Sequence, residues 1–192
     1  MESKHPVQLA VTDDLVRNRL TAFFRFFLAI PHLIWVSLWG VAVVFAVIVS
    51  WFATLFAGET PAGLHSFIAR WLRYSTHVRA YLYLVADPFP DFMGDGGYPI
   101  DLHVTGPAPQ RRVVTGFRII LAIPVLIVSA VLDYLAQALA VISWFVAIFT
   151  GRVPQGVRNL AAWCSKFTGQ TYAYALLLTD RYPSFDGINA ES

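Results

Sequence analysis

The chain has 192 residues, of which 57% are hydrophobic and 14% are charged, and its formal net charge is +2. Soluble domains average about 45–50% hydrophobic and about 25% charged residues, so this composition argues against a soluble globule and favours a membrane protein. The Lys and Arg residues form no dense tract of the kind that binds nucleic acid, and the single cysteine, Cys164, excludes an intramolecular disulfide framework and a CxxC metal site.

The first predicted element is a short strand over residues 7–11, where hydrophobic and polar or small residues alternate. Alternation with a period of two is typical of a strand with one buried face. Residues 100–104 repeat the pattern. We expect the two strands to pair with each other or with the stretches AYLYLV and AYALLL, whose composition also fits a strand.

A run of 32 residues without charge, 26–57, follows the first strand, and a second run, 119–150, contains only the charge of Asp133. As a single helix, 32 residues measure roughly 48 Å, whereas the hydrocarbon core of a bilayer is about 30 Å thick. We therefore predict two transmembrane hairpins, at about 20–57 and about 113–150.

The tips of these hairpins are expected near Trp39 and Gly40 in the first run and near Asp133 and Tyr134 in the second. Arginine or lysine residues flank both ends of both runs, and such residues prefer the cytoplasmic side. This pattern predicts four crossings of a bacterial cytoplasmic membrane with both termini in the cytoplasm. One long span per run, and hairpins embedded without crossing, are the alternatives.

An amphipathic helix is predicted after each run, at about 62–86 and about 155–179, since apolar residues recur every three to four positions. Each helix follows a Gly-x-x-Pro-x-Gly motif, which marks a helix stop and restart. The helices are expected to lie in the headgroup layer or, equally, to pack against the chain's own long runs. The candidate interfacial residues are Arg70, Trp71, Arg73, Arg158, Trp163 and Lys166.

The chain contains an internal repeat. When it is aligned with itself at an offset of 93 residues (117 minus 24), 27 of the 87 positions from Pro6 to Phe92 are identical, among them glycines, prolines, tryptophans and arginines. Repetition of such residues indicates a duplicated structural unit. We predict units at 1–93 and 94–192, each with a strand, a hairpin and an amphipathic helix, in an all-α integral membrane protein with minor β structure.

Several stretches carry a resemblance to a known family. RFFLAIP, WFATLFAGETPAG and AYLYLVADPFP in the first unit, with WFVAIFTGRVPQG and AYALLLTDRYPSF in the second, resemble the bacterial membrane family called domain of unknown function 4389. The resemblance covers nearly the whole chain as two tandem copies. It implies an integral membrane protein and no particular activity.

Five polar residues in or beside the apolar runs are candidates for binding lipid phosphate or lining a polar path between the units, because ionisable groups inside a bilayer are functional candidates. Asp133 and Gln137 are the main break in the repeat. The competing interpretation of each residue is structural or interfacial. The candidates are Arg25, Arg118, Asp133, Gln137 and His32.

The sequence therefore favours a non-catalytic scaffold or accessory subunit, whose partners are membrane lipids and other membrane proteins or further copies of the chain. No nucleic acid, metal or cofactor is expected, because the histidines follow no ligand spacing. The alternatives are a small transporter or channel and, last, a membrane-surface enzyme.

Overall fold

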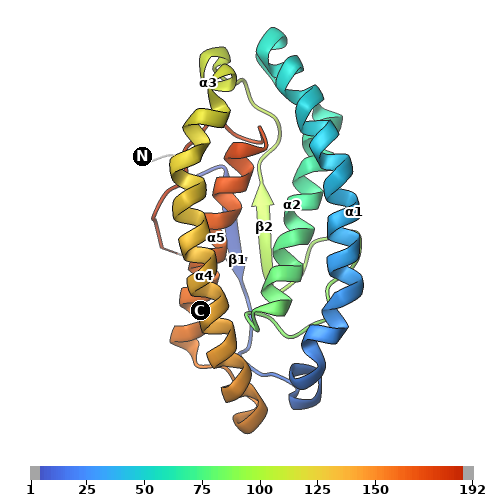
Figure 1. The fold of residues 1–192 in the computed structure, drawn as a ribbon, viewed down its shortest axis with the longest axis vertical. Helices are drawn as coiled ribbons and strands as arrows, with labels where there is room; N and C mark the ends of the chain where they lie inside the picture. The colour runs from blue at the N-terminus through green and yellow to red at the C-terminus, as the bar shows by residue number, and fades with distance from the viewer. Residues whose placement is uncertain (1–4, 188–192) are drawn as a thin grey trace.

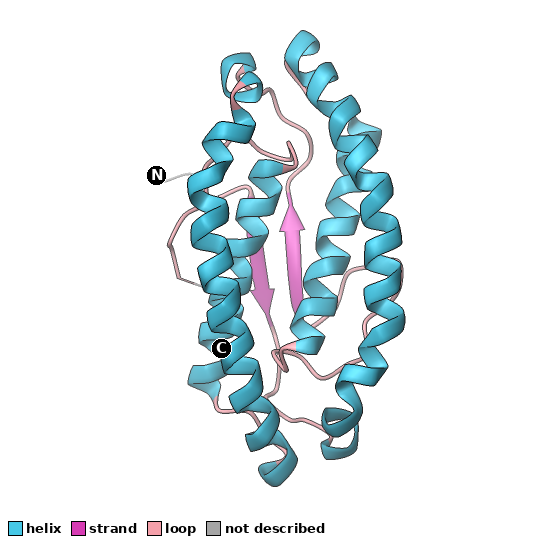
Figure 2. Ribbon diagram, viewed as in Figure 1, coloured by secondary structure: helices cyan, strands magenta, loops and turns pink. Residues whose placement is uncertain are grey.

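The structure, a computed structural model, describes residues 5–187 and is mostly helical with one small sheet, as the sequence predicts (Figures 1 and 2). In chain order the elements are β1 (Val7–Val11), α1 (Arg19–Ala57), α2 (Ala62–Leu82), β2 (Ile100–Val104), α3 (Arg112–Gly116), α4 (Arg118–Thr150) and α5 (Gln155–Ala175).

The elements form three layers. The two long helices α1 and α4 run in opposite directions and make the first layer, as Figure 1 shows. The shorter helices α2 and α5 pack beneath them and against each other, and the sheet packs on α2 and α5. The core lies between these layers, with Ile68, Leu72 and Leu102 among its fully buried side chains.

The prediction of two membrane hairpins is wrong, because each apolar run forms one continuous helix. Gly40, the expected first tip, lies inside α1, and a Cβ atom placed there would be only 3.5 Å from the indole ring of Trp71 on α2. Gly40 therefore lies within α1 against Trp71 and does not break the helix. The helix ends instead at Gly58, which has the left-handed φ of 84° typical of a helix C-cap.

The second run behaves in the same way. Asp133, the expected second tip, lies in the middle of α4, which continues to Gly151 at φ 73°. The carboxylate is accommodated there because Arg79, Tyr83 and Gln137 surround it. Length alone suggested a hairpin, but length cannot tell whether a helix crosses a bilayer or runs in another direction.

The two predicted strands are confirmed, and they pair with each other. The pairing is antiparallel, with Val7 opposite Val104 and Val11 opposite Ile100. The Tyr-rich stretches belong to the ends of α2 and α5 and to the turns that follow, so they add no strand. The apolar side chains of β1 are buried against the helices, and the opposite face carries partly exposed Gln8 and exposed His103.

The predicted amphipathic helices are confirmed as α2 and α5, and their apolar faces are buried within the protein. Ile68, Leu72 and Val78 of α2 are each at most 2% exposed, and α5 is buried along most of its length. This observation favours the alternative in which the helices pack against the chain's own long helices.

The long helices have an inverted distribution of side chains. The buried positions of α1 are small or polar, including Ala22, Ala29, Ser50 and Thr54, whereas its large apolar residues point outward. Of the 41 exposed large hydrophobic residues in the described part of the chain, 18 lie in α1 and 14 in α4. By length and composition, both helices are sufficient to cross a membrane.

A pair of reciprocal hydrogen bonds joins the halves of the chain. The Trp51 indole donates to the Thr115 carbonyl and the Trp144 indole donates to the Ala22 carbonyl, each at 2.9 Å. The strands also cross over, since β1 packs on α5 and β2 packs on α2. The halves therefore form one interlocked body with approximate two-fold symmetry, visible in Figure 1.

Candidate functional site

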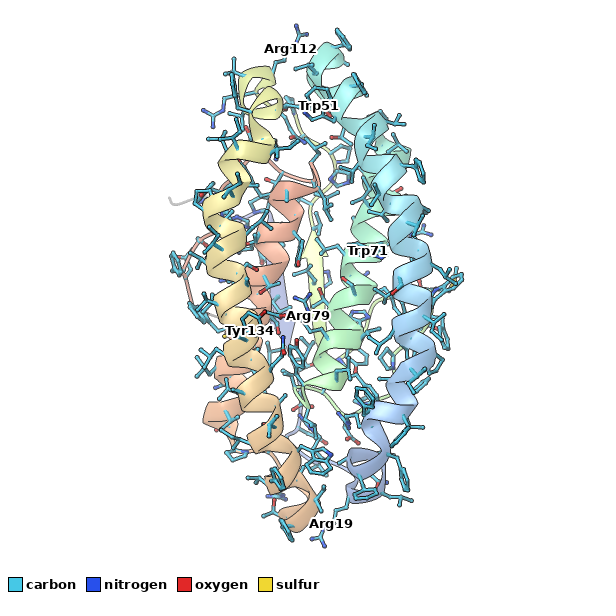
Figure 3. The ribbon with its side chains drawn as sticks, in the orientation of Figure 1. Arg19, Trp51, Trp71, Arg79, Arg112 and Tyr134 are labelled. Atoms are coloured by element: carbon cyan, nitrogen blue, oxygen red, sulfur yellow. The ribbon has the colours of Figure 1, made fainter. Side chains whose placement is uncertain are left out.

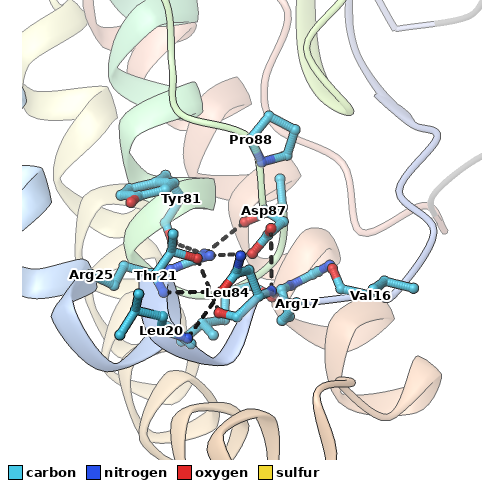
Figure 4. A network of polar contacts seen from close by, with 12 residues as sticks. Val16, Arg17, Leu20, Thr21, Arg25, Tyr81, Leu84, Asp87 and Pro88 are labelled. Atoms are coloured by element: carbon cyan, nitrogen blue, oxygen red, sulfur yellow. Dashed lines mark hydrogen bonds and ion pairs between the residues drawn. The ribbon is translucent and has the colours of Figure 1, made fainter.

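Arg25, a candidate from the sequence, closes the end of α2. It is 2% exposed, and its Nη1 donates to the carbonyls of Tyr81 and Ala86, both at 2.8 Å. Its Nη2 lies 2.5 Å from a carboxylate oxygen of Asp87, and its guanidinium lies 4.4 Å from the centre of the Tyr81 ring (Figure 4). The arginine thus satisfies carbonyls that the end of the helix leaves without partners.

Arg118 does the same for α5. Its Nη1 donates to the carbonyls of Tyr174 and Thr179, both at 2.6 Å, and its guanidinium lies 4.6 Å from the centre of the Tyr174 ring. Its Nη2 donates to the amide oxygen of Gln110 at 2.6 Å, where Arg25 has a carboxylate. These two arginines are engaged inside the protein and are not positioned on a lipid-facing surface.

Sequence reasoning missed the equivalent residues Arg17 and Gln110. Arg17 donates to the Leu84 carbonyl at 3.0 and 3.1 Å and pairs with Asp13, as seen beside Arg25 in Figure 4. Gln110 donates to the Leu177 carbonyl at 2.7 Å. The offset of 93 residues that relates Arg25 to Arg118 also relates Arg17 to Gln110. This offset is the feature of the sequence from which the two residues could have been found.

The structure brings Asp133 and Gln137 together. The Gln137 amide donates to the Asp133 carboxylate at 3.2 Å, the Tyr83 hydroxyl lies 3.4 Å from it, and Arg79 lies 3.6 Å from it. The Asp133 and Arg79 side chains are 29% and 26% exposed. Arg79 also faces the ring of Tyr172, its own equivalent in the repeat, so this cluster lies where the two halves meet (Figure 3).

His32 is fully buried and lies apart from that cluster. Its Nδ1 is 2.6 Å from the Tyr74 hydroxyl, and its ring stacks on Phe92 with the centroids 4.3 Å apart. These contacts fasten the segment after α2 to α1. Asp133 and Gln137 bind each other, whereas Arg25, Arg118 and His32 have separate partners, so the five candidates do not line a common path.

The candidate interfacial residues mostly hold the fold together. Trp71 donates to the Val36 carbonyl of α1 at 3.0 Å, and Trp163 and Lys166 donate to the Asp186 carbonyl at 3.2 and 3.0 Å. Arg158 is 6% exposed, and burial lowers its pKa from the ordinary value. Of the six residues, Arg70 is the one that is exposed to solvent.

A further charged group, which sequence reasoning missed, links α2 to the outer side of the sheet. Asp101 accepts from Arg73, forming an ion pair, and lies 3.0 Å from Nε2 of His77. Burial by itself would raise the pKa of the Asp101 carboxyl, but the His77 and Arg73 hydrogen bonds and the Arg73 charge bring it well below its usual range. Within residues 5–187, no three His, Cys, Asp or Glu side chains form a group able to hold a metal ion.

Comparison with known proteins identifies the repeat. The family model described as Domain of unknown function (DUF4389) matches residues 19–94 and again residues 112–186. Together the two segments cover more than half of the chain, and both strands lie outside them. No curated protein and no solved structure matches the chain.

Proposed function

Because the chain belongs to the DUF4389 family through both of its halves, and the family description names no activity, we propose that it is a non-catalytic membrane protein that serves as a scaffold or accessory subunit. Its outer surface binds lipids and partner membrane proteins of a bacterial cytoplasmic membrane. Both termini lie on the cytoplasmic side.

The outward face of α1 and α4 is the observation that carries this proposal. Phe26, Phe45 and Phe56 of α1 and Ile119 and Phe149 of α4 are each 66% or more exposed. Contiguous apolar patches of more than a few hundred Å² are rare on soluble monomers and mark contacts with membranes or proteins. Exposing the large apolar side chains along the outer faces of both long helices to water would be strongly unfavourable.

The polar candidates support a structural role over a reactive one. Arg25, Arg118 and His32 each make internal hydrogen bonds that close helix ends or fasten loops, and the atoms that have no partner, Nε of each arginine and Nε2 of His32, are buried. A catalytic group would instead need a free atom directed toward a substrate. The proposal therefore assigns the function to the surface of the protein.

Flotation with liposomes tests the proposal. Purified protein should float with vesicles, and the double substitution Val44→Glu and Phe45→Lys on the outer face of α1 should leave it in the soluble or aggregated fraction. The matched control, Gln8→Glu and His103→Lys, places charges on the outer face of the sheet and should float normally. Wild-type protein that stays at the bottom of the gradient contradicts the proposal.

A small transporter or channel is the second candidate, and the observation that favours it is the partly exposed Asp133 in the otherwise uncharged stretch 119–150. Protein in sealed liposomes would then support ion or proton flux that Asp133→Asn reduces. Absence of flux from the wild-type protein discards this candidate, while flotation remains a separate result.

A further inference from the structure

We infer that α1 and α4 lie parallel to the membrane surface within one leaflet, with α2, α5 and the sheet on its aqueous side. This inference rests on the proposed function and specifies how the apolar face meets the lipid. The occupant of that face is the acyl layer of a single leaflet, and the approximate two-fold axis of the molecule lies along the membrane normal.

Helix length is the first argument. The 39 residues of α1 measure about 58 Å and the 33 of α4 about 50 Å, whereas the hydrocarbon core is about 30 Å thick and the whole bilayer about 40–45 Å. The outer faces of both helices carry large apolar residues along their whole length, interrupted by Ser37 in α1 and by Asp133 and Gln137 in α4. A crossing orientation would leave well over a third of that apolar surface outside the hydrocarbon core, whereas an in-plane orientation keeps all of it at the depth of one leaflet.

The position of the sheet is the second argument. The strands lie beside the middle of the long helices, as Figure 1 shows. If α1 crossed the membrane, the Arg73–Asp101 pair and His103, whose side chain is 60% exposed, would lie at the depth of the bilayer centre. Charged groups at that depth cost at least about 2.5–3.5 kcal/mol each. The same groups meet water when the long helices lie flat.

The two ends of the molecule are the third argument. Arg19 lies at one tip of the molecule and Arg112 at the other, as Figure 3 shows. Arg111 directly precedes Arg112, and Arg152 follows the end of α4. A crossing protein places its cations mainly on one side. Two cationic tips are expected when both lie at the same surface, where they attract the anionic lipids of the cytoplasmic leaflet.

The dimensions of a flat orientation also agree. An α-helix with its side chains is about 10–12 Å in diameter, and one leaflet contributes about 15 Å of hydrocarbon, half of the core. A single layer of helices therefore fits within one leaflet. The small and polar residues of α1, including Ser50 and Thr54, then face the protein layer on the aqueous side.

Fluorophores placed along α1 test the orientation. Leu20, Leu38 and Phe56 are 67%, 60% and 74% exposed and follow each other at intervals of 18 residues, which is five full turns, so they share one outer face. Each is replaced by cysteine on a Cys164→Ala background, labelled with bimane and incorporated into vesicles of phosphatidylcholine and phosphatidylglycerol. Quenching by phospholipids with nitroxides at successive acyl carbons then reports depth.

The in-plane orientation predicts the same quenching profile at all three positions. A crossing helix predicts deep quenching at one position, with shallower quenching on either side of it, and that result overturns the inference. If the labelled variants float with vesicles but show the quenching profile of a crossing helix, the in-plane orientation is wrong and the proposed function stands. If the wild-type protein fails to float, the proposed function is wrong as well.

Cysteine labelling in sealed vesicles gives an independent measurement. Arg19→Cys, Arg112→Cys and His103→Cys should all react with a membrane-impermeant maleimide from the same side, and Leu38→Cys should react at least tenfold more slowly from either side. Reaction of Arg19→Cys and Arg112→Cys from opposite sides overturns the inference.

Discussion

Arg25 and Arg118, 93 positions apart, make the same pair of hydrogen bonds, each to a carbonyl in the last turn of the next short helix and to a second carbonyl five residues later. They differ in the third partner, which is the Asp87 carboxylate for Arg25 and the Gln110 amide for Arg118. The repeat thus preserves the hydrogen bonds of the arginine to the two carbonyls, whereas a negatively charged partner contacts the arginine in the first copy only.

This difference predicts unequal costs of substitution. Arg25→Gln leaves carbonyls and a carboxylate without their partner and should lower the free energy of unfolding by about 3 kcal/mol, whereas Arg118→Gln should cost about 2 kcal/mol. Urea unfolding in mild detergent measures both values. Arg70→Gln, at an exposed position of α2, is the control and should change stability by less than about 0.5 kcal/mol. A larger loss for Arg118→Gln contradicts the assignment of Asp87 as the stronger partner.

The two tryptophans that join the halves should act independently. Trp51→Phe and Trp144→Phe each remove one hydrogen bond to a carbonyl of the other half, at a cost of about 1 kcal/mol with some loss of packing. Because the two contacts lie at opposite ends of the molecule, the double variant should lose the sum of the single losses within about 0.5 kcal/mol. Thermal unfolding followed by circular dichroism measures this additivity, and a strongly non-additive result indicates coupling through the long helices.

Asp101 should make the fold sensitive to acid. The pKa of its carboxyl is lower in the folded than in the unfolded protein, so the unfolded state binds more protons at low pH. Its stabilising contribution is therefore present above the unfolded pKa, near 4, and is lost as pH falls below it. Asp101→Asn should flatten the decline in unfolding free energy between about pH 5 and pH 3. Glu59→Gln, at an exposed position, should keep the wild-type decline.

Two equivalent glycines offer a stabilising change. Gly63 and Gly156 lie in the first turns of α2 and α5, and a Cβ atom at either position would meet nothing within 4 Å. Alanine at each should raise the free energy of unfolding by about 0.4–1 kcal/mol, since it restricts the unfolded chain. Gly94→Ala should do the opposite, because Gly94 has a φ of 70° and its Cβ would lie 2.9 Å from Cβ of Tyr74. Urea unfolding curves of the three variants measure these effects.

The sequence predicted what depends on local periodicity. Alternation over residues 7–11 and 100–104 located both strands, and the apolar stripe from Leu64 onward located α2, because each pattern reflects one buried face. The identical residues at an offset of 93 revealed the duplication, which the family model confirms. These features require no knowledge of which elements lie side by side.

Features that depend on tertiary contacts were not predictable. Gly40 was the expected tip of the first hairpin, and only the tertiary structure shows that it lies inside α1 against the Trp71 ring. Arg25 and Arg118 suggested contact with lipid, and only the positions of the α2 and α5 ends show that they cap helices. Arg25 and Tyr81 recur as Arg118 and Tyr174 at the offset of 93 residues, and this recurrence was a signal of that role in the sequence.

The exchange of strands between the halves has a consequence for a shorter chain. A polypeptide with a single copy would have no partner for its strand. Its tryptophan would lack the carbonyl to which Trp51 donates, and the carbonyl of its C-cap glycine would lack the backbone amide that the second copy supplies to Gly58. Two such polypeptides would complete the same arrangement as a symmetric homodimer with an isologous interface. The tandem chain corresponds to that dimer with its two copies covalently linked. Linkage allows each copy to diverge, as the equivalent positions Gly40 and Asp133 illustrate.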